Sequence, residues 1–142
     1  MKKQLLLLLL LSSALLSMAQ DSDKKKYNRN KAIEDEIGYA EAVKVGNTIY
    51  ISGVVGKGDM AVAIKKVYDA LGKTLGEFGV TFQNVVKENV YAIDLDDFIK
   101  NKAIRKDYFK GDFPAATWIG VKRLYSPDLI LEVELIAVTK DR

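Results

Sequence analysis

Apolar and polar residues follow two different periods along the first part of the chain, and each period predicts its own kind of element. Residues 42–45 and 48–52 are short runs of strand formers on either side of Gly46-Asn47, a two-residue turn typical of a β-hairpin. Between residues 60 and 78, apolar residues recur at helical spacing, at positions 64, 67, 68, 71, 75 and 78. Asp59 can cap the start of this predicted helix and Gly79 can end it.

The second half of the chain repeats this change of period. Residues 85–93 predict a third strand, residues 96–98 cap a second helix that runs to about Phe109, and Gly111 ends it. Two further strands are predicted over residues 115–123 and 129–138. The predicted order is β-β-α-β-α-β-β, which defines an α+β domain with one mixed sheet and two helices on one face.

The last predicted strand is apolar on both faces. Leu131 and Leu135 point to one face, whereas Ile136 and Val138 share the other face with Glu132. Because the two helices cover only one face of the sheet, the other face needs a different cover. We therefore expect an oligomer that buries the second face.

The first residues of the chain have the composition of a secretory signal. Two lysines precede an apolar run over residues 5–16, and Ser17 and Ala19 occupy the small-residue positions of a cleavage site. The run is short for a bilayer span, although an uncleaved amino-terminal anchor is the alternative interpretation. We predict a signal peptide over residues 1–19, a polar flexible linker over residues 20–37 and a folded domain over residues 38–142.

Charge and composition exclude several classes of function. The chain has a formal net charge of +3, but Lys2 and Lys3 lie in the predicted signal, so the remainder is close to neutral. A nearly neutral domain does not favour a nucleic-acid partner. The sequence contains no Cys and no His, which excludes zinc sites built from these residues, His-based triads and Cys nucleophiles. A hard-cation site built from Asp and Glu stays open as an alternative, but no EF-hand spacing is present and we predict no metal. Catalysis must then use carboxylates, hydroxyls, lysines, backbone groups and bound water.

Four separated stretches carry a resemblance to a known family. They read "GYAEAVKVGNTIYISG", "VVKENVYAIDLDDF", "DYFKGDFPA" and "LEVELIAV", in this order and at suitable spacing. The chain from about Tyr39 to Val138 resembles the RidA family, which is also called YjgF or L-PSP. The resemblance implies a chorismate-mutase-like α+β fold, a homotrimer with ligand pockets between subunits, and hydrolysis of enamines and imines without a cofactor. The L-PSP name also carries an RNA-cleavage label.

The resemblance also implies site residues, one position at a time. Tyr39 in "GYAEA" matches the family's pocket tyrosine, and Ser52 and Gly53 in "ISG" match the serine and glycine that line the pocket. Glu132, the first glutamate of "LEVE", matches the acid beside the attacking water. We predict catalytic roles for Glu132 and Ser52 and ligand-binding roles for Tyr39 and Gly53.

Other positions depart from the family pattern. Ala116 stands where the family has an arginine that binds the substrate carboxylate, and Trp118 follows on the same strand face. We predict that both line the ligand pocket, with interface packing as the alternative role for Trp118. Lys102, where the family has an asparagine, is either a replacement cation or a surface lysine. The alternation along the strand places Arg123 opposite Ala116, and we interpret it as structural.

These observations lead to three hypotheses. The first is an exported imine or enamine deaminase that acts without the usual arginine, with a small planar molecule as ligand and a periplasmic or secreted location. The second is a homotrimer of the same fold that binds a small ligand without catalysis or acts as a chaperone. The third, an endoribonuclease, is disfavoured by the near-neutral charge and the absence of His. We expect no cofactor, no nucleic acid and no membrane span after signal cleavage.

Overall fold

A computed structural model describes residues 24–139, so the predicted signal peptide lies outside the described part of the chain. The elements in chain order are β1 (Lys25–Tyr27), α2 (Lys31–Ile37), β2 (Ala42–Val45), β3 (Thr48–Lys57), α3 (Met60–Glu77), a 3-10 turn (Phe82–Asn84), β4 (Val85–Ala92), α4 (Leu95–Lys100), α5 (Lys102–Phe109), β5 (Ala115–Gly120) and β6 (Leu129–Val138).

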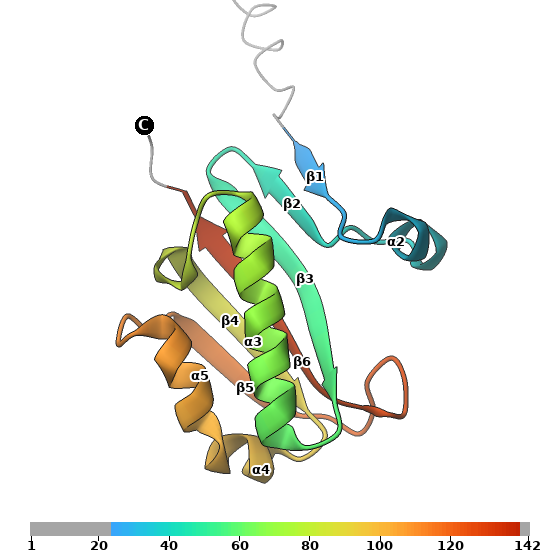
Figure 1. Ribbon diagram of the computed structural model, residues 1–142, viewed down its shortest axis with the longest axis vertical. Coiled ribbons are helices and arrows are strands. Elements are labelled where there is room, and N and C mark those ends of the chain that lie inside the picture. The colour runs from blue at the N-terminus through green and yellow to red at the C-terminus, as the bar shows by residue number, and fades with distance from the viewer. Residues whose placement is uncertain (1–23, 140–142) are drawn as a thin grey trace, which may run out of the picture.

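The strands form one mixed sheet, as predicted. Their order is β1-β2-β3-β6-β4-β5, so that β6, the last strand described, lies in the middle of the sheet (Figure 1). All neighbours pair antiparallel except β4 and β5, which are parallel and are connected through α4 and α5. A parallel pair requires such a crossover connection because its two strands run in the same direction.

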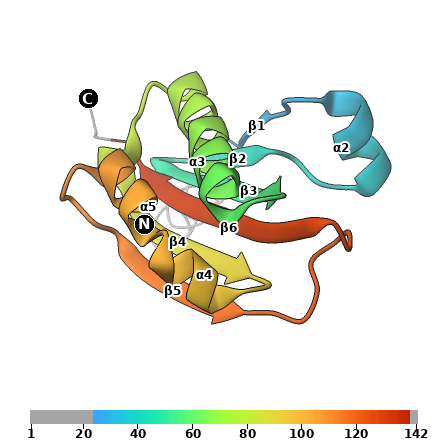
Figure 2. The same cartoon turned by 60° about the horizontal axis from the view of Figure 1, so that its bottom comes forward.

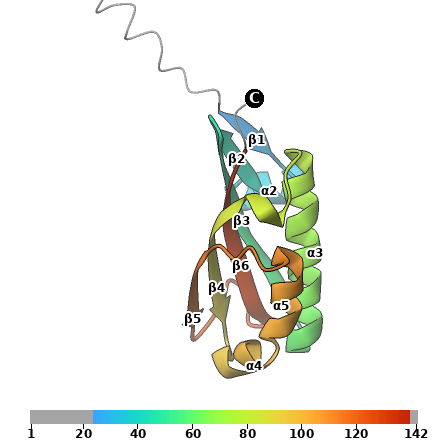
Figure 3. The same ribbon diagram turned by 90° about the vertical axis from the view of Figure 1, so that its left-hand side faces the viewer.

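The helices α3, α4 and α5 cover one face of this sheet and leave the other face open (Figures 2 and 3). The alternation in β6 follows this division: Leu131, Val133, Leu135 and Ala137 are buried beneath the helices, whereas Glu132 and its alternate neighbours are only half-buried on the open face. The predicted α+β architecture with helices on one face is therefore confirmed.

Helix α3 begins and ends where the sequence predicts. The side chain of Asp59 accepts a hydrogen bond from the backbone N–H of Val62, which caps the first turn. The fully buried side chains of Ile64, Val67 and Leu71 form the stripe that packs on the sheet. Gly79 follows the helix with φ of 68°, a left-handed conformation that glycine adopts without strain.

Residues 24–37 differ from the predicted flexible linker. Strand β1 pairs with β2, and Asn30 caps α2 by accepting a hydrogen bond from the backbone N–H of Ile33. The polar composition of this segment suggested disorder, but its polar side chains make specific contacts. Among them, Arg29 reaches across to α3 and donates a hydrogen bond to Thr74 Oγ1 over 2.7 Å.

Three further boundaries differ from the predictions. Strand β3 continues to Lys57 instead of ending at Ser52, and β5 ends at Gly120. The second helix is two helices, capped at its start by Asp94, and it breaks at Asn101. The Asn101 side chain donates to the carbonyl of Asp97 over 2.9 Å, which is the kind of local bond that competes with the helix backbone.

Candidate functional site

The open face of the sheet contains a cavity of about 320 Å³ beside the middle of β3. It brings together four of the predicted site residues, namely Tyr39, Ser52, Gly53 and Glu132. The remaining lining residues are mostly apolar: Ile37, Val55, Tyr125 and Leu129. These residues are far apart in the sequence. They meet because β3 pairs with β6, and because residues 40 and 41 accept hydrogen bonds from Ser52 of β3.

A bulge in β3 forms the floor of this cavity. The register of β3 against β6 shifts between Ile51 and Val54, so Ser52 and Gly53 lie at an irregular position in the ladder. A Cβ atom added to Gly53 would lie 1.9 Å from Glu132 Oε1. The absence of a side chain at Gly53 therefore allows the Glu132 carboxyl group to lie directly against the backbone of β3.

Replacing Gly53 with alanine tests this contact. We expect Gly53→Ala to push the Glu132 carboxyl group aside. The rate of the reaction proposed below should then fall at least tenfold. Since the displaced atoms are the end of a flexible side chain, the free energy of unfolding should change by no more than about 1.5 kcal/mol. Gly76→Ala in α3 is the matched control, because its Cβ would meet nothing within 4 Å. Activity assays and denaturant unfolding measure both effects; an unchanged rate for Gly53→Ala would contradict the contact.

The two glutamates of β6 have different surroundings. Glu134 accepts hydrogen bonds from Asn89 Nδ2 over 2.6 Å and from the Tyr91 hydroxyl over 3.2 Å. Glu132 accepts no hydrogen bond from any residue in the range 24–139, and burial, followed by the nearby charge of Glu134, raises the pKa of its carboxyl group. A carboxyl group whose pKa is raised above its usual value suits general acid–base chemistry.

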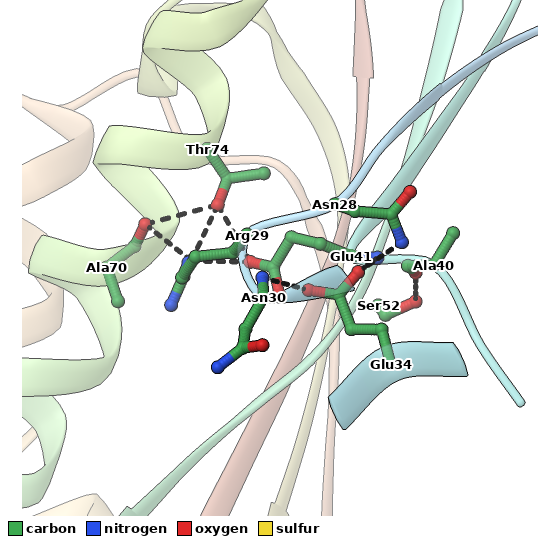
Figure 4. Close-up of polar contacts among 9 residues, drawn as sticks. All are labelled: Asn28, Arg29, Asn30, Glu34, Ala40, Glu41, Ser52, Ala70 and Thr74. Atoms are coloured by element: carbon green, nitrogen blue, oxygen red, sulfur yellow. Dashed lines mark hydrogen bonds and ion pairs between the residues drawn. The ribbon is translucent and has the colours of Figure 1, made fainter. Parts of the chain in front are cut away.

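A polar network holds the wall of the cavity that comes from residues 28–41 (Figure 4). The buried Glu34 carboxylate accepts hydrogen bonds from the backbone N–H groups of Asn30, over 2.7 Å, and Glu41, over 3.2 Å. The carbonyl of Glu34 accepts a hydrogen bond from the backbone N–H of Tyr39 over 3.0 Å. Burial raises the pKa of Glu34, but the hydrogen bonds to its carboxylate outweigh this effect and leave the pKa lowered. The charged carboxylate therefore holds the backbone of Asn30 and Glu41, while the carbonyl of Glu34 holds Tyr39.

Ser52 belongs to the same network. Its hydroxyl donates a hydrogen bond to the carbonyl of Ala40 over 2.7 Å, and its backbone N–H donates to the carbonyl of Glu41 over 2.9 Å. Ser52 lines the cavity, and because its hydroxyl proton is already engaged, its oxygen can act toward a ligand as an acceptor. This geometry suits binding of an N–H group better than nucleophilic attack.

Within one chain, Ala116 and Trp118 do not lie on the same face of the sheet as Glu132. Trp118 pairs with Val90 in β4, and Val90 pairs with Val133 in β6, which is buried beneath the helices. The side-chain alternation within β5 could not show which face is which, because that depends on the register across β4. Within one chain, these two residues are therefore separated from the cavity by the thickness of the sheet.

Trp118 instead belongs to a buried ion-pair cluster that sequence reasoning missed. Glu88, fully buried, accepts hydrogen bonds from Arg105 Nε over 2.8 Å, from the Tyr68 hydroxyl over 2.7 Å and from Trp118 Nε1 over 3.2 Å. The Arg105 guanidinium also lies 4.6 Å from the ring centroid of Phe109. Burial, followed by the charge of Glu88, raises the pKa of Tyr68, so this hydroxyl remains a donor. We assign the cluster a structural role, because its donors are satisfied within the core.

Lys102 is also outside the cavity. It is the first residue of α5 and its side chain is exposed on the helix layer.

Among the residues described, no group of three or more acidic residues could hold a metal ion. In the same part of the chain, no helix is long and apolar enough to cross a membrane.

A second cavity, of about 410 Å³, adjoins the first. It shares Tyr125 and Glu132 with the first cavity and is also lined by Tyr91, Val121, Arg123, Leu124 and Glu134. Arg123 was interpreted from the sequence as structural. Because β5 ends at Gly120, Arg123 lies in the segment after the strand, and strand alternation could not predict its place at this cavity.

The fold is that of an α+β protein with two adjoining cavities on the open face of its sheet. A family model described as "Endoribonuclease L-PSP" matches residues 29–139. The chain belongs to this family, which is the RidA, or YjgF, family that its motifs resemble.

Individual relatives agree with this assignment. The chain is 37% identical over 109 residues to the human 2-iminobutanoate/2-iminopropanoate deaminase, with 70% of this chain and 79% of the relative covered. It is 35% identical over 108 residues to a RutC family protein of Pyrococcus abyssi, covering 70% of this chain and 84% of the relative. Among solved structures, Rv2704 of Mycobacterium tuberculosis, from the YjgF/YER057c/UK114 family, superposes with a TM-score of 0.76 at 24% identity, covering 82% of this chain and all of that one.

Proposed function

We propose that this protein hydrolyses small imines to the corresponding carbonyl compound and ammonia. The observation that carries the proposal is the Glu132 carboxyl group, which lies against Gly53 in the cavity and has a raised pKa. The name of the human relative, an iminobutanoate and iminopropanoate deaminase, supports the reaction class. The three other residues predicted from the resemblance, Tyr39, Ser52 and Gly53, line the same cavity.

The proposed reaction needs one water molecule and no redox partner. The oxygen of water attacks the carbon of the C=N bond, and the π electrons of that bond move to the nitrogen. Glu132 accepts a proton from the water and returns a proton to the nitrogen. Glu132 then accepts the hydroxyl proton of the resulting carbinolamine and delivers a proton to its nitrogen. The C–N bond breaks, its electron pair leaves with the nitrogen as ammonia, and the C=O bond forms.

The neighbouring groups orient the imine toward Glu132. The Ser52 oxygen can accept a hydrogen bond from the imine N–H, because its own proton is engaged by Ala40. Tyr39 also lines the cavity. Burial, followed by the charges of Glu34 and Glu41, raises the pKa of its hydroxyl, which stays a donor. Holding the imine and a water molecule in such a cavity reduces the entropy cost of their reaction.

The test is direct measurement of product. 2-Iminobutanoate is generated in the assay by oxidation of the amino acid with an amino-acid oxidase, and the release of ammonia and 2-oxobutanoate is followed against spontaneous hydrolysis. We expect the purified domain to accelerate both products equally. Saturable binding without acceleration would support the alternative of a non-catalytic ligand-binding protein.

We further propose that the protein is a homotrimer whose open sheet faces pack together. The open face carries exposed apolar residues, including Tyr50, with 50% of its surface exposed, and Ile119, with 44% exposed. Apolar area of this kind is typical of a surface that another subunit covers.

Export of the protein and removal of residues 1–19 stay predictions from the sequence.

Sedimentation equilibrium at micromolar concentration tests the assembly. We expect three times the mass of one chain, and we expect Tyr50→Asp to shift the protein toward monomer, since it places a charge in the packed face. Val62→Asp is the matched control, because Val62 is also half exposed but lies on the outer side of α3. A monomeric wild-type protein, or equal loss of assembly in both variants, would contradict this arrangement.

A further inference from the structure

The guanidinium of Arg29 connects the segment before β2 to the helix layer. Arg29 Nη2 donates hydrogen bonds to Thr74 Oγ1 over 2.7 Å and to the carbonyl of Ala70 over 3.3 Å, both in α3. The same nitrogen forms an ion pair with Glu41. Arg29 therefore joins one turn of α3 to the residue that directly precedes β2, as Figure 4 shows.

Glu41 links this contact to the first cavity. Its side chain has only 7% of its surface exposed and also accepts a hydrogen bond from Thr74 Oγ1 over 2.8 Å. Its backbone carbonyl accepts the N–H of Ser52, and the neighbouring carbonyl of Ala40 accepts the Ser52 hydroxyl. Both hydrogen bonds that Ser52 donates therefore end beside the point where Arg29 and Thr74 hold the chain.

The position of Glu41 depends on these two donors. A carboxylate that is removed from water is stable only where hydrogen-bond donors replace its hydration. Among residues 24–139, the donors to the Glu41 side chain are Arg29 and Thr74, and the charged donor makes the stronger hydrogen bond. Without Arg29, we expect the Glu41 side chain to turn toward water and to displace the carbonyls of residues 40 and 41.

We propose that Arg29 is a positioning residue for imine hydrolysis: it holds Glu41 against α3 and thereby fixes the Ser52 hydroxyl group in the cavity. This inference rests on the proposed function, in which the Ser52 oxygen accepts a hydrogen bond from the imine N–H. Arg29 is not one of the residues that line the two cavities, so it acts without touching the ligand. A reaction that requires precise orientation is sensitive to such a distant group.

The first test is steady-state kinetics with the imine generated as above. Arg29→Met keeps the aliphatic part of the side chain and removes its donors, and we expect it to lower kcat about 10- to 100-fold. Because the cavity itself is unchanged, KM should change by less than about threefold. Arg29→Lys, which can still donate to Glu41, should recover part of kcat. Lys31→Met is the matched control, since Lys31 lies in the same segment but pairs with the exposed Asp35, and it should change neither constant.

A double-mutant cycle with Ser52→Ala separates positioning from general destabilisation. If Arg29 acts through the Ser52 hydroxyl group, Arg29→Met should lower kcat by less than about threefold when Ser52 is already alanine. Thr74→Val, which removes the second donor to Glu41, should show the same dependence on Ser52. Equal losses from Arg29→Met with and without the Ser52 hydroxyl group would overturn the proposal, and so would an unchanged kcat in the protein that retains Ser52.

Amide hydrogen exchange, followed by NMR, tests the same contact without turnover. The Ser52 amide donates to the Glu41 carbonyl over 2.9 Å, and it should exchange at least about tenfold faster in Arg29→Met through local opening. The amide of Val133 in β6 should exchange at the wild-type rate, and Lys31→Met should leave both amides unchanged. If the wild-type protein hydrolyses no imine, this result still decides whether Arg29 holds Ser52. An unchanged Ser52 amide, or equal acceleration at Ser52 and Val133, overturns the proposal.

Discussion

Replacing Glu132 with glutamine is expected to lower kcat for imine hydrolysis by about 10²- to 10⁴-fold, the usual contribution of a general acid–base group. Glutamine keeps the size of the side chain and can still fit against Gly53, but it can neither accept nor return the proton. Since Glu132 has a raised pKa and no hydrogen-bond donor among the described residues, its replacement should not destabilise the fold. Steady-state kinetics and thermal unfolding on the same preparations measure both effects.

Glu134→Gln is the matched control for this prediction. Glu134 lies two residues along the same face of β6, so that it has the same orientation but different hydrogen-bond partners. We expect its replacement to reduce activity far less than Glu132→Gln. Similar losses in the two variants would mean that the negative charge of the face, and not proton transfer by Glu132, supports the reaction.

The second prediction with a large effect concerns protein stability and the buried ion pair of Glu88 and Arg105. We expect Glu88→Ala to lower the free energy of unfolding by about 3–5 kcal/mol, because it leaves a buried guanidinium without its partner. Arg105 keeps only 4% of its surface exposed and cannot recover its hydration in place. Chemical denaturation measures the loss, and the double variant Glu88→Leu with Arg105→Met should recover part of it.

An exposed ion pair provides the comparison. Lys31 and Asp35 form an (i, i+4) pair on α2 with 73% and 57% of their side-chain surfaces exposed. We expect Asp35→Ala to change the free energy of unfolding by no more than about 1 kcal/mol, since water solvates either charge when the other is removed. If Glu88→Ala lowers the free energy of unfolding as little as Asp35→Ala does, the prediction is wrong and the buried ion pair contributes no more to stability than the exposed one.

The sequence predicted the fold well because its strongest patterns are local. The stripe of α3, its Asp59 cap and the alternation in β6 each depend on residues that are close together in the chain. The resemblance predicted the residues of the first cavity, Tyr39, Ser52, Gly53 and Glu132, which the structure brings together. Local periodicity could not predict the polar contacts of residues 24–37, since their partners, such as Thr74, are distant in sequence.

The position of Ala116 and Trp118 relative to Glu132 could not be predicted from the sequence for a different reason. Alternation along one strand shows which residues share a face, but it does not relate that face to the face of another strand. That relation depends on the register between β4 and its neighbours, which the sequence alone does not give. For the same reason, Glu88 and Arg105 could not be recognised as a buried pair, although each carries a charge that usually lies on the surface.

The central position of β6 has a consequence for the order of folding during synthesis. Strands β3 and β4 both pair with β6 and not with each other, so the sheet consists of two separate parts until residues 129–138 are available. A chain that is still attached to the ribosome, with β6 not yet made, therefore cannot close its core. If residues 1–19 are the export signal that the sequence predicts, this delay keeps the nascent chain unfolded while the translocation machinery engages it.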